Sequence, residues 1–201
     1  MKRIIVLAAG ALLCSSLALR AQVVELSPFY GYRFGGEIQI QATGEHLSLK
    51  DAPAYGVAVD FAPKGGDFKL ELLWSHQESS VDFNGYNGLG KLDVDVDQFM
   101  IGGVAETARG RWRGYVTGML GATYFSSEGN GSDTRFGLSV GVGVKYFLIK
   151  NRLALRADAR GYCSFVSSES AFIYHNGTTV ATFSGSTLWQ GEVSAGITLG
   201  F

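Results

Sequence analysis

The chain has 201 residues with 28 glycines, only 3 prolines, 12% aromatic residues, 17% charged residues and a formal net charge of −1. A disordered chain would carry more charge and fewer aromatic residues, so this composition predicts a folded domain, and its glycine content fits an all-β one. The near-neutral charge gives no electrostatic basis for a nucleic acid partner.

The N-terminus has the pattern of a secretory signal peptide. Two basic residues precede an apolar run over residues 4–13, and small residues lead to a cleavage site after Ala21. This pattern predicts a cleaved signal peptide over residues 1–21 and a mature domain over residues 22–201.

Cysteines and hydropathy limit how the mature domain can be anchored. A lipoprotein anchor at Cys14 is the alternative for the N-terminus, but such a site needs a small residue where this chain has Leu13. Cys163 is then the only mature cysteine, so we expect no internal disulfide. After the signal no apolar stretch approaches the ~20 residues of a membrane helix, so any membrane crossing must use strands.

Eight segments of the mature chain alternate apolar and polar residues, as strands with one apolar face do. In chain order they are Val24–Phe34, Tyr55–Ala62, Phe68–Ser75, Leu92–Val104, Trp112–Tyr124, Arg135–Leu148, Leu153–Phe165 and Trp189–Phe201. Three of the connections are short turns. The other four are longer and rich in Gly, Ser and Asn: Gly35–Pro53, Glu78–Gly90, Ser126–Asp133 and Val166–Ser186. We therefore expect an antiparallel up-and-down barrel with long loops at one end and short turns at the other.

Charged residues in the middle of the strands lie on the polar face. They are Arg33, Asp60, Lys69, Glu71, Arg135, Lys145, Arg156, Asp158, Arg160 and Glu192, to which the alternation adds Glu25, Asp93, Asp95, Asp97 and Arg113. We expect these side chains to fill a narrow lumen, since eight-stranded barrels leave an interior that side chains just fill. The near balance of acids and bases favours a salt-bridged, closed lumen over a selective pore, which tends to carry rings of one sign.

Aromatic residues of the apolar face gather near both ends of the strands. On the short-turn side they are Phe61, Phe68, Trp112, Tyr146 and Phe201; on the long-loop side they are Tyr32, Phe34, Tyr55, Trp74, Tyr124, Phe136, Phe165 and Trp189. Two aromatic girdles around an apolar band mark the two interfaces of a bilayer, so the apolar face is expected to point outward into lipid. A sheet in hydrocarbon must also close, which requires the last strand to pair with the first.

Two places depart from the pattern. Pro28 lacks a backbone donor in a strand that must pair on both sides, which predicts a bulge or a register shift there. Gln98 falls on the face assigned as outward, whereas Phe99 and Ile101 fall on the inward face, which predicts a change of phase within that strand.

Two segments carry a family resemblance. The terminal aromatic Phe201, preceded by Val193, Ile197 and Leu199 in alternation, resembles the sorting signal of bacterial outer-membrane barrels, which the barrel-assembly machinery reads. The segment "GVGVKYFLIKNRLALRADARGY" resembles the penultimate hairpin of the small outer-membrane β-barrel family with OmpA-like, OmpX-like and OmpW-like members. The resemblance implies an eight-stranded transmembrane β-barrel in the bacterial outer membrane, with both termini in the periplasm, in contact with outer-membrane lipid and lipopolysaccharide.

Two clusters could carry chemistry. Asp93, Asp95 and Asp97 could bind calcium, but no loop of alternating oxygen ligands follows them, so a solvated acidic mouth paired with Arg113 or Arg135 is favoured. In "WSHQESS", His76 lies near Ser75, Ser79 and Glu78, and lipid A-modifying enzymes of the outer membrane use Ser and His. Neighbours on a strand mostly face apart, however, and no motif of those enzymes matches. No residue pattern points to a cofactor or a metal site.

These observations predict a non-enzymatic, closed structural barrel whose outer loops contact a ligand or surface that the sequence does not identify. The first alternative is a narrow OmpW-like porin that conducts small molecules. The second is a lipid A-modifying enzyme. Fold alone does not decide among them.

Overall fold

The computed structural model describes residues 22–39, 46–63, 68–85, 88–107, 110–127, 131–165, 170–175, 178–183 and 187–201. Among these residues, no helix is long and apolar enough to cross a membrane. The predicted signal peptide lies outside the described residues, so it stays a prediction.

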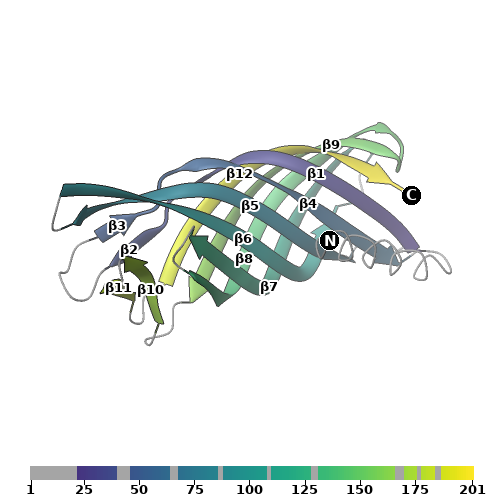
Figure 1. The fold of residues 1–201 in the computed structure, drawn as a ribbon. Coiled ribbons are helices and arrows are strands. Elements are labelled where there is room, and N and C mark those ends of the chain that lie inside the picture. Colours follow the sequence, from purple (N-terminus) through teal and green to yellow (C-terminus); the bar gives the residue numbers. More distant parts are fainter. Residues whose placement is uncertain are drawn as a thin grey trace, which may run out of the picture.

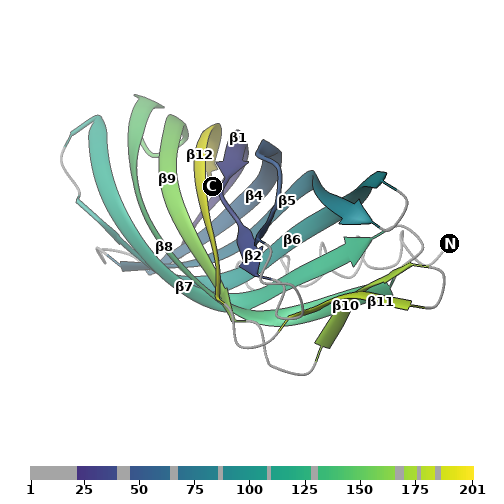
Figure 2. The ribbon, with the colours of Figure 1, turned by 90° about the vertical axis from the view of Figure 1, so that its left-hand side faces the viewer.

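Eight strands close into one barrel. Figure 1 and Figure 2 show it from two sides. The strands are β1 (Gln22–Phe34), β4 (Ala52–Pro63), β5 (Phe68–Gly85), β6 (Gly88–Glu106), β7 (Trp112–Ser127), β8 (Gly131–Ile149), β9 (Leu153–Phe165) and β12 (Thr187–Gly200). Each pairs antiparallel with its neighbours in that order, and β12 pairs back to β1. The predicted eight-stranded antiparallel up-and-down barrel is confirmed.

Four short strands form two separate hairpins at one end of the barrel (Figure 1). They are β2 (Glu37–Gln39) with β3 (His46–Ser48), and β10 (Ser170–His175) with β11 (Thr178–Phe183). The end of β4 with the start of β5, the end of β6 with the start of β7, and the turn between β8 and β9 lie at the opposite end (Figure 1). We call the two ends the long-loop end and the turn end.

The longest hairpin of the barrel, β5 with β6, reaches well past its neighbours at the long-loop end (Figure 1). Its pairing continues from Glu78 opposite Asp95 to Gly85 opposite Gly88. The prediction that Glu78–Gly90 is a loop is therefore wrong. Its polar composition resembles a loop, but the backbone groups of the two arms satisfy each other across the hairpin.

The last strand is held to its final residue. The Phe201 amide donates to the Val24 carbonyl at 2.9 Å, and the Gly200 amide donates to the Arg152 carbonyl at 2.8 Å. The first bond closes the wall between β12 and β1 at the turn end, and the second holds β12 to the residue that precedes β9. They satisfy the requirement that a barrel in lipid leaves no unpaired edge.

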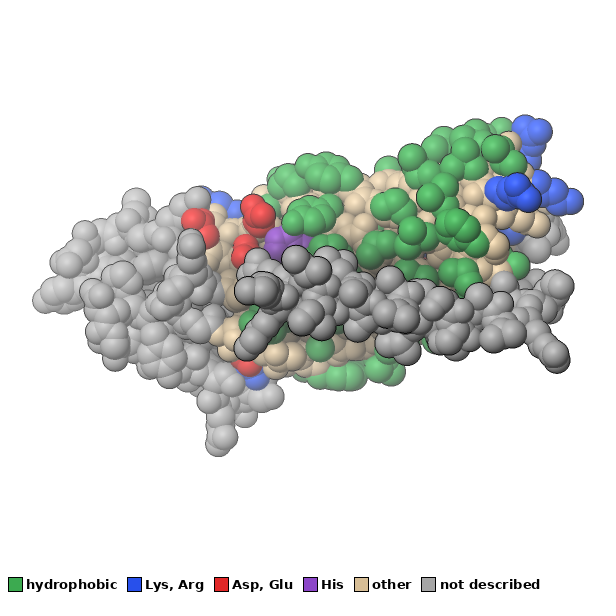
Figure 3. Space-filling model, turned by 45° about the vertical axis from the view of Figure 1, so that its right-hand side comes forward, with side chains coloured by type: hydrophobic (Ala, Val, Ile, Leu, Met, Phe, Trp, Pro, Cys, Tyr) green, Lys and Arg blue, Asp and Glu red, His purple; other side chains and the backbone are tan. Residues whose placement is uncertain are grey.

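The burial of side chains is the reverse of that in a soluble protein. Phe68 and Val140 on the outside are 70% and 67% exposed, whereas the charged side chains of Glu71 and Lys145 inside are 0% exposed. On the face in view, Figure 3 shows apolar side chains over the middle of the barrel, with Lys and Arg at one end and Asp, Glu and a few Lys or Arg toward the other. The apolar face of the strands points outward, as predicted.

Strand β6 corrects the predicted facing. Three carboxylates expected inside point outward instead: Asp93, Asp95 and Asp97. The predicted change of phase is also absent, since β6 pairs with β5 and β7 without a register shift. One alternation places Phe99 and Ile101 on the outer apolar face and the fully buried Gln98 in the lumen, where Thr123 Oγ1 donates to its Oε1 at 2.8 Å.

Pro28 causes no register shift. The pairing of β1 with β4 continues through Pro28 opposite Val57, and the pairing with β12 resumes in the same register beyond it. The predicted bulge is therefore wrong. On β12, a Cβ added to Gly196 would clash with the Pro28 carbonyl oxygen, so the glycine allows the two backbones to come close.

This close approach predicts that Gly196→Val destabilises the barrel by roughly 1–3 kcal/mol, the usual cost of overpacking. The matched control is Gly118→Val, because an added Cβ at Gly118 meets nothing within 4 Å. The measurement is the urea midpoint of each refolded variant in detergent micelles, followed by tryptophan fluorescence. Equal midpoints for the two variants would contradict the prediction.

Candidate functional site

Charged side chains from every strand of the barrel wall meet in the lumen. Five carboxylates and five cations form one network: Glu25, Asp60, Glu71, Glu106 and Asp158 with Lys69, Arg113, Lys145, Arg156 and Arg160. Arg33 and Glu192 form a separate ion pair. Inward-facing positions alternate along each strand, so residues far apart in sequence face one another across a narrow interior.

Two lysines hold the network together toward the turn end. Lys145 Nζ lies 2.6 Å from Glu25 Oε2, 2.8 Å from Asp60 Oδ2 and 3.5 Å from Glu106 Oε2. Lys69 Nζ bridges the same two glutamates, at 2.7 Å from Glu25 and 2.8 Å from Glu106. Both lysines are buried, so each positive charge is compensated by carboxylates rather than by bulk water.

Two arginines of β9 continue the network toward the middle of the barrel. Arg156 donates to Glu71 and Asp158, each at 2.8 Å, and Arg160 donates to Glu71 at 3.1 Å. The Tyr115 hydroxyl donates to Asp158, and the Arg156 guanidinium stacks over the Tyr115 ring at 4.9 Å. These planar groups therefore contact one another directly across the interior.

An apolar cluster follows along the lumen. It contains Phe29, Ala58, Leu73, Met100, Met119 and Tyr162, all buried. The sequence pattern did not identify these residues as part of the lumen, because large apolar side chains also occur on the outer face of the same strands. Their presence means that the interior contains a packed apolar layer as well as ion pairs.

A smaller ion pair lies on the long-loop side of the apolar cluster. Arg33 donates to Glu192 at 2.7 Å, and Ser75 Oγ donates to the same carboxylate at 3.0 Å. The guanidinium also lies 4.9 Å from the centre of the Tyr162 ring. Toward the long-loop end follow neutral amides, with Gln190 donating to Gln77 at 3.3 Å.

The structure places seven of the ten residues predicted for the lumen in one ion-pair network, and two more, Arg33 and Glu192, in the separate pair. The tenth, Arg135, lies toward the long-loop end, where it forms an ion pair with Asp133 at 2.5 Å. Sequence reasoning missed Glu106, which lies 3.1 Å from Arg113 as well as beside both lysines. The signal was present, because Glu106 falls inward once Phe99 and Ile101 are assigned to the outer face.

Several solved structures are similar to this barrel, and two of them match it with a TM-score above 0.5. Neisserial surface protein A matches with a TM-score of 0.56 and 14% identity, over 90% of this chain and 97% of its own. The outer membrane protein OprG from Pseudomonas aeruginosa matches with a TM-score of 0.56 and 13% identity, over 90% and 96%. The chain has the fold of the small outer-membrane β-barrels. No protein-family model and no curated protein sequence matches it, so the likeness concerns the fold alone.

Exposed aromatic residues lie near both ends of the strands, and their role as bilayer girdles stays a prediction. Trp112 and Tyr146 contact each other near the turn end, with ring centres 4.7 Å apart. Phe136 and Phe165 stack near the long-loop end at 6.0 Å. The predicted assembly-signal residues are exposed on the outer face of β12 and just beyond it: Val193, Ile197, Leu199 and Phe201.

The structure separates His76 from the serines of "WSHQESS". Ser75 points inward to Glu192, and Ser79 is also buried, donating to the Lys50 carbonyl. His76 lies on the outer face instead, where its Nδ1 donates to Asp97 Oδ1 at 2.9 Å. A serine and histidine pair built from these residues is therefore not formed. The side chains of the other two histidines, His46 and His175, lie outside the described part of the molecule.

Proposed function

We propose that this protein is an integral barrel of the bacterial outer membrane with a closed lumen, and that it acts through surface contact at its long-loop end rather than by conduction or catalysis. One observation carries the proposal: ion pairs from all eight strands and an apolar cluster pack the interior. Packed interiors leave no continuous path for ions. The outer apolar band and its girdles support contact with outer-membrane lipid, including lipopolysaccharide.

The first test is ion conductance. Residues 22–201 are refolded in detergent, checked for different gel migration with and without boiling, and added to a planar bilayer. We expect no steady single-channel steps, because the charged side chains of the lumen are bound to one another. Steady steps from a folded barrel would contradict the closed lumen and would favour the alternative, a narrow OmpW-like porin.

The second test concerns the long-loop end. Joining Ser80 to Asp93, which face each other across the hairpin, through an Asn-Gly turn removes the tip without changing the register of β5 and β6. We expect cells that display the trimmed barrel to lose adhesion to polystyrene and to lose autoaggregation, at unchanged amounts of folded protein. Unchanged adhesion and autoaggregation would contradict a contact role for this hairpin.

A further inference from the structure

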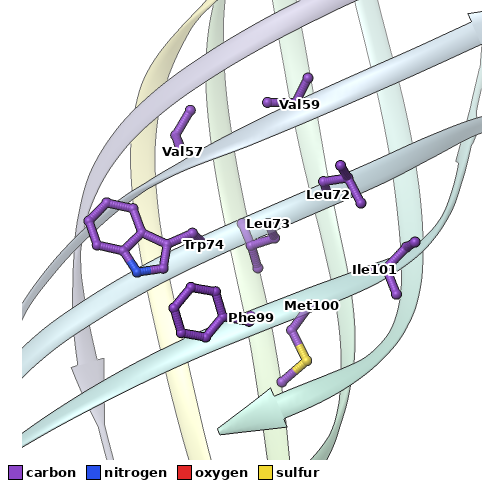
Figure 4. A pocket seen from close by; sticks show the side chains of 8 residues that line it. All are labelled: Val57, Val59, Leu72, Leu73, Trp74, Phe99, Met100 and Ile101. Carbon is purple, nitrogen blue, oxygen red and sulfur yellow. The ribbon is translucent and has the colours of Figure 1, made fainter. Parts of the chain in front are cut away.

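An apolar groove runs along the outer face of the barrel over three neighbouring strands. Figure 4 shows its lining, with Val57 and Val59 on β4, Leu72 to Trp74 on β5, and Phe99 to Ile101 on β6. Leu73 and Met100 also line the groove, although their side chains point inward into the apolar cluster of the lumen, and the volume is about 460 Å³. That volume lies in the range of small-molecule sites.

Toward the long-loop end, the groove ends at four polar residues, His76, Glu78, Asp95 and Asp97, which we call the polar step. The outward-facing pairs of β5 and β6 follow in strict order: Leu72 with Ile101, Trp74 with Phe99, His76 with Asp97, and Glu78 with Asp95. Two apolar pairs are thus followed directly by two polar pairs. A site with this order matches a molecule that has an apolar tail and a polar head.

Hydrogen bonds fix the position of the Asp97 carboxylate in the polar step. Asp97 Oδ1 accepts hydrogen bonds from Trp74 Nε1 at 3.0 Å and from His76 Nδ1 at 2.9 Å. Trp74 therefore belongs both to the groove and to the polar step. The His76 and Asp97 side chains are only 14% and 19% exposed, so the carboxylate is held in one place by its neighbours.

The charge at the step is negative. Asp97, Asp95 and Glu78 contribute three carboxylates to the outward face of the two strands, and Glu78 is 77% exposed. An anionic head would be repelled there, whereas a protonated amine could pair with the carboxylates. An acyl tail fits the groove because all of its lining side chains are apolar.

We propose that this groove binds a membrane lipid whose head carries a protonated amine, with an acyl chain between Leu72 and Phe99 and the amine beside Asp97. The proposal rests on the proposed placement of the apolar band in lipid, but not on the closed lumen. Anionic lipid and a second copy of this chain are the competing occupants.

The test uses the fluorescence of Trp74, which is one of three tryptophans in the chain. In the variant Trp112→Phe/Trp189→Phe, only Trp74 remains to report. The barrel is reconstituted in vesicles of phosphatidylethanolamine and phosphatidylglycerol with identical acyl chains, and the chains of one lipid or the other are brominated. Brominated chains quench tryptophan on contact, so the difference in quenching measures which lipid occupies the groove.

We expect brominated phosphatidylethanolamine to be enriched about two- to five-fold at Trp74, the range that a partly exposed ion pair provides. The enrichment should vanish in Asp97→Asn, whose amide oxygen can still accept the hydrogen bonds from Trp74 and His76. The variant Trp74→Phe/Trp112→Phe retains only Trp189, which is exposed on the outer face of β12 and should show no preference.

Each other outcome overturns a stated claim. Equal quenching of Trp74 by both lipids, a preference for phosphatidylglycerol, or an unchanged preference in Asp97→Asn would overturn the amine site. If quenching is absent because copies of the barrel cover the groove, Trp74 is protected while Trp189 is quenched, and the site is an interface. Absence of quenching at both tryptophans would instead overturn the placement of the apolar band in lipid.

Discussion

Lys145→Met is expected to destabilise the barrel by about 3–5 kcal/mol, the cost of breaking a buried ion pair by removing one partner. Methionine keeps the length of the side chain but carries no charge. Glu25, Asp60 and Glu106 all lie within 3.5 Å of Lys145 Nζ. Removal of this ammonium leaves three buried carboxylates close together with too few positive charges to balance them. The free energy of unfolding is measured by urea titration in lipid vesicles.

Two further variants separate this effect from a general loss of charge. Lys150→Met removes a lysine from the exposed turn between β8 and β9, and its effect should stay within about 0.5 kcal/mol. Lys145→Met combined with Asp60→Leu should recover part of the lost stability, because one uncompensated carboxylate is gone. A cost for Lys145→Met as small as that of Lys150→Met would show that the network contributes little.

The barrel itself could be predicted because its constraints repeat in every strand. The alternation with period two predicts strands, and the aromatic residues near both strand ends predict that the apolar face points into lipid, where the sheet must close. Errors in one strand do not disturb such a prediction. In β9, for example, the alternation within that strand places Arg156, Asp158 and Arg160 in the lumen, whatever the facing of β6.

Strand β6 could not be assigned because the barrel has apolar side chains on both faces. Val96 and Met100 belong to the packed lumen, whereas Phe99 and Ile101 belong to the outer band, and hydrophobicity alone does not distinguish the two. The assignment depends on register with β5, which is set by pairing across the hairpin. The same register brings His76 opposite Asp97, so that contact was also beyond the reach of sequence reasoning.

The two faces of β5 and β6 divide the chemistry of the molecule. Their inward side chains join a network in which each charge is compensated, which favours a closed and static interior. Their outward side chains pass from an apolar groove to an acidic step within a few residues. Function in this barrel is therefore expected on its outer surface and at its long-loop end, where groups remain that can bind a partner.

Phe201→Ser is expected to prevent most of the protein from assembling into the outer membrane of cells. Refolding of the purified variant in vitro should be nearly unchanged. The Phe201 side chain is 77% exposed, so it contributes little packing, and the variant keeps the backbone bond from Phe201 to Val24. The loss in cells follows from the resemblance of the terminal strand to a signal that the barrel-assembly machinery reads. The measurement is the amount of heat-modifiable barrel in outer-membrane fractions.

Phe68→Ser is the matched control, since Phe68 is a 70% exposed aromatic residue at the same turn end but lies outside the terminal strand. Equal losses for the two variants would mean that aromatic residues at the interface, rather than the terminal position, govern assembly.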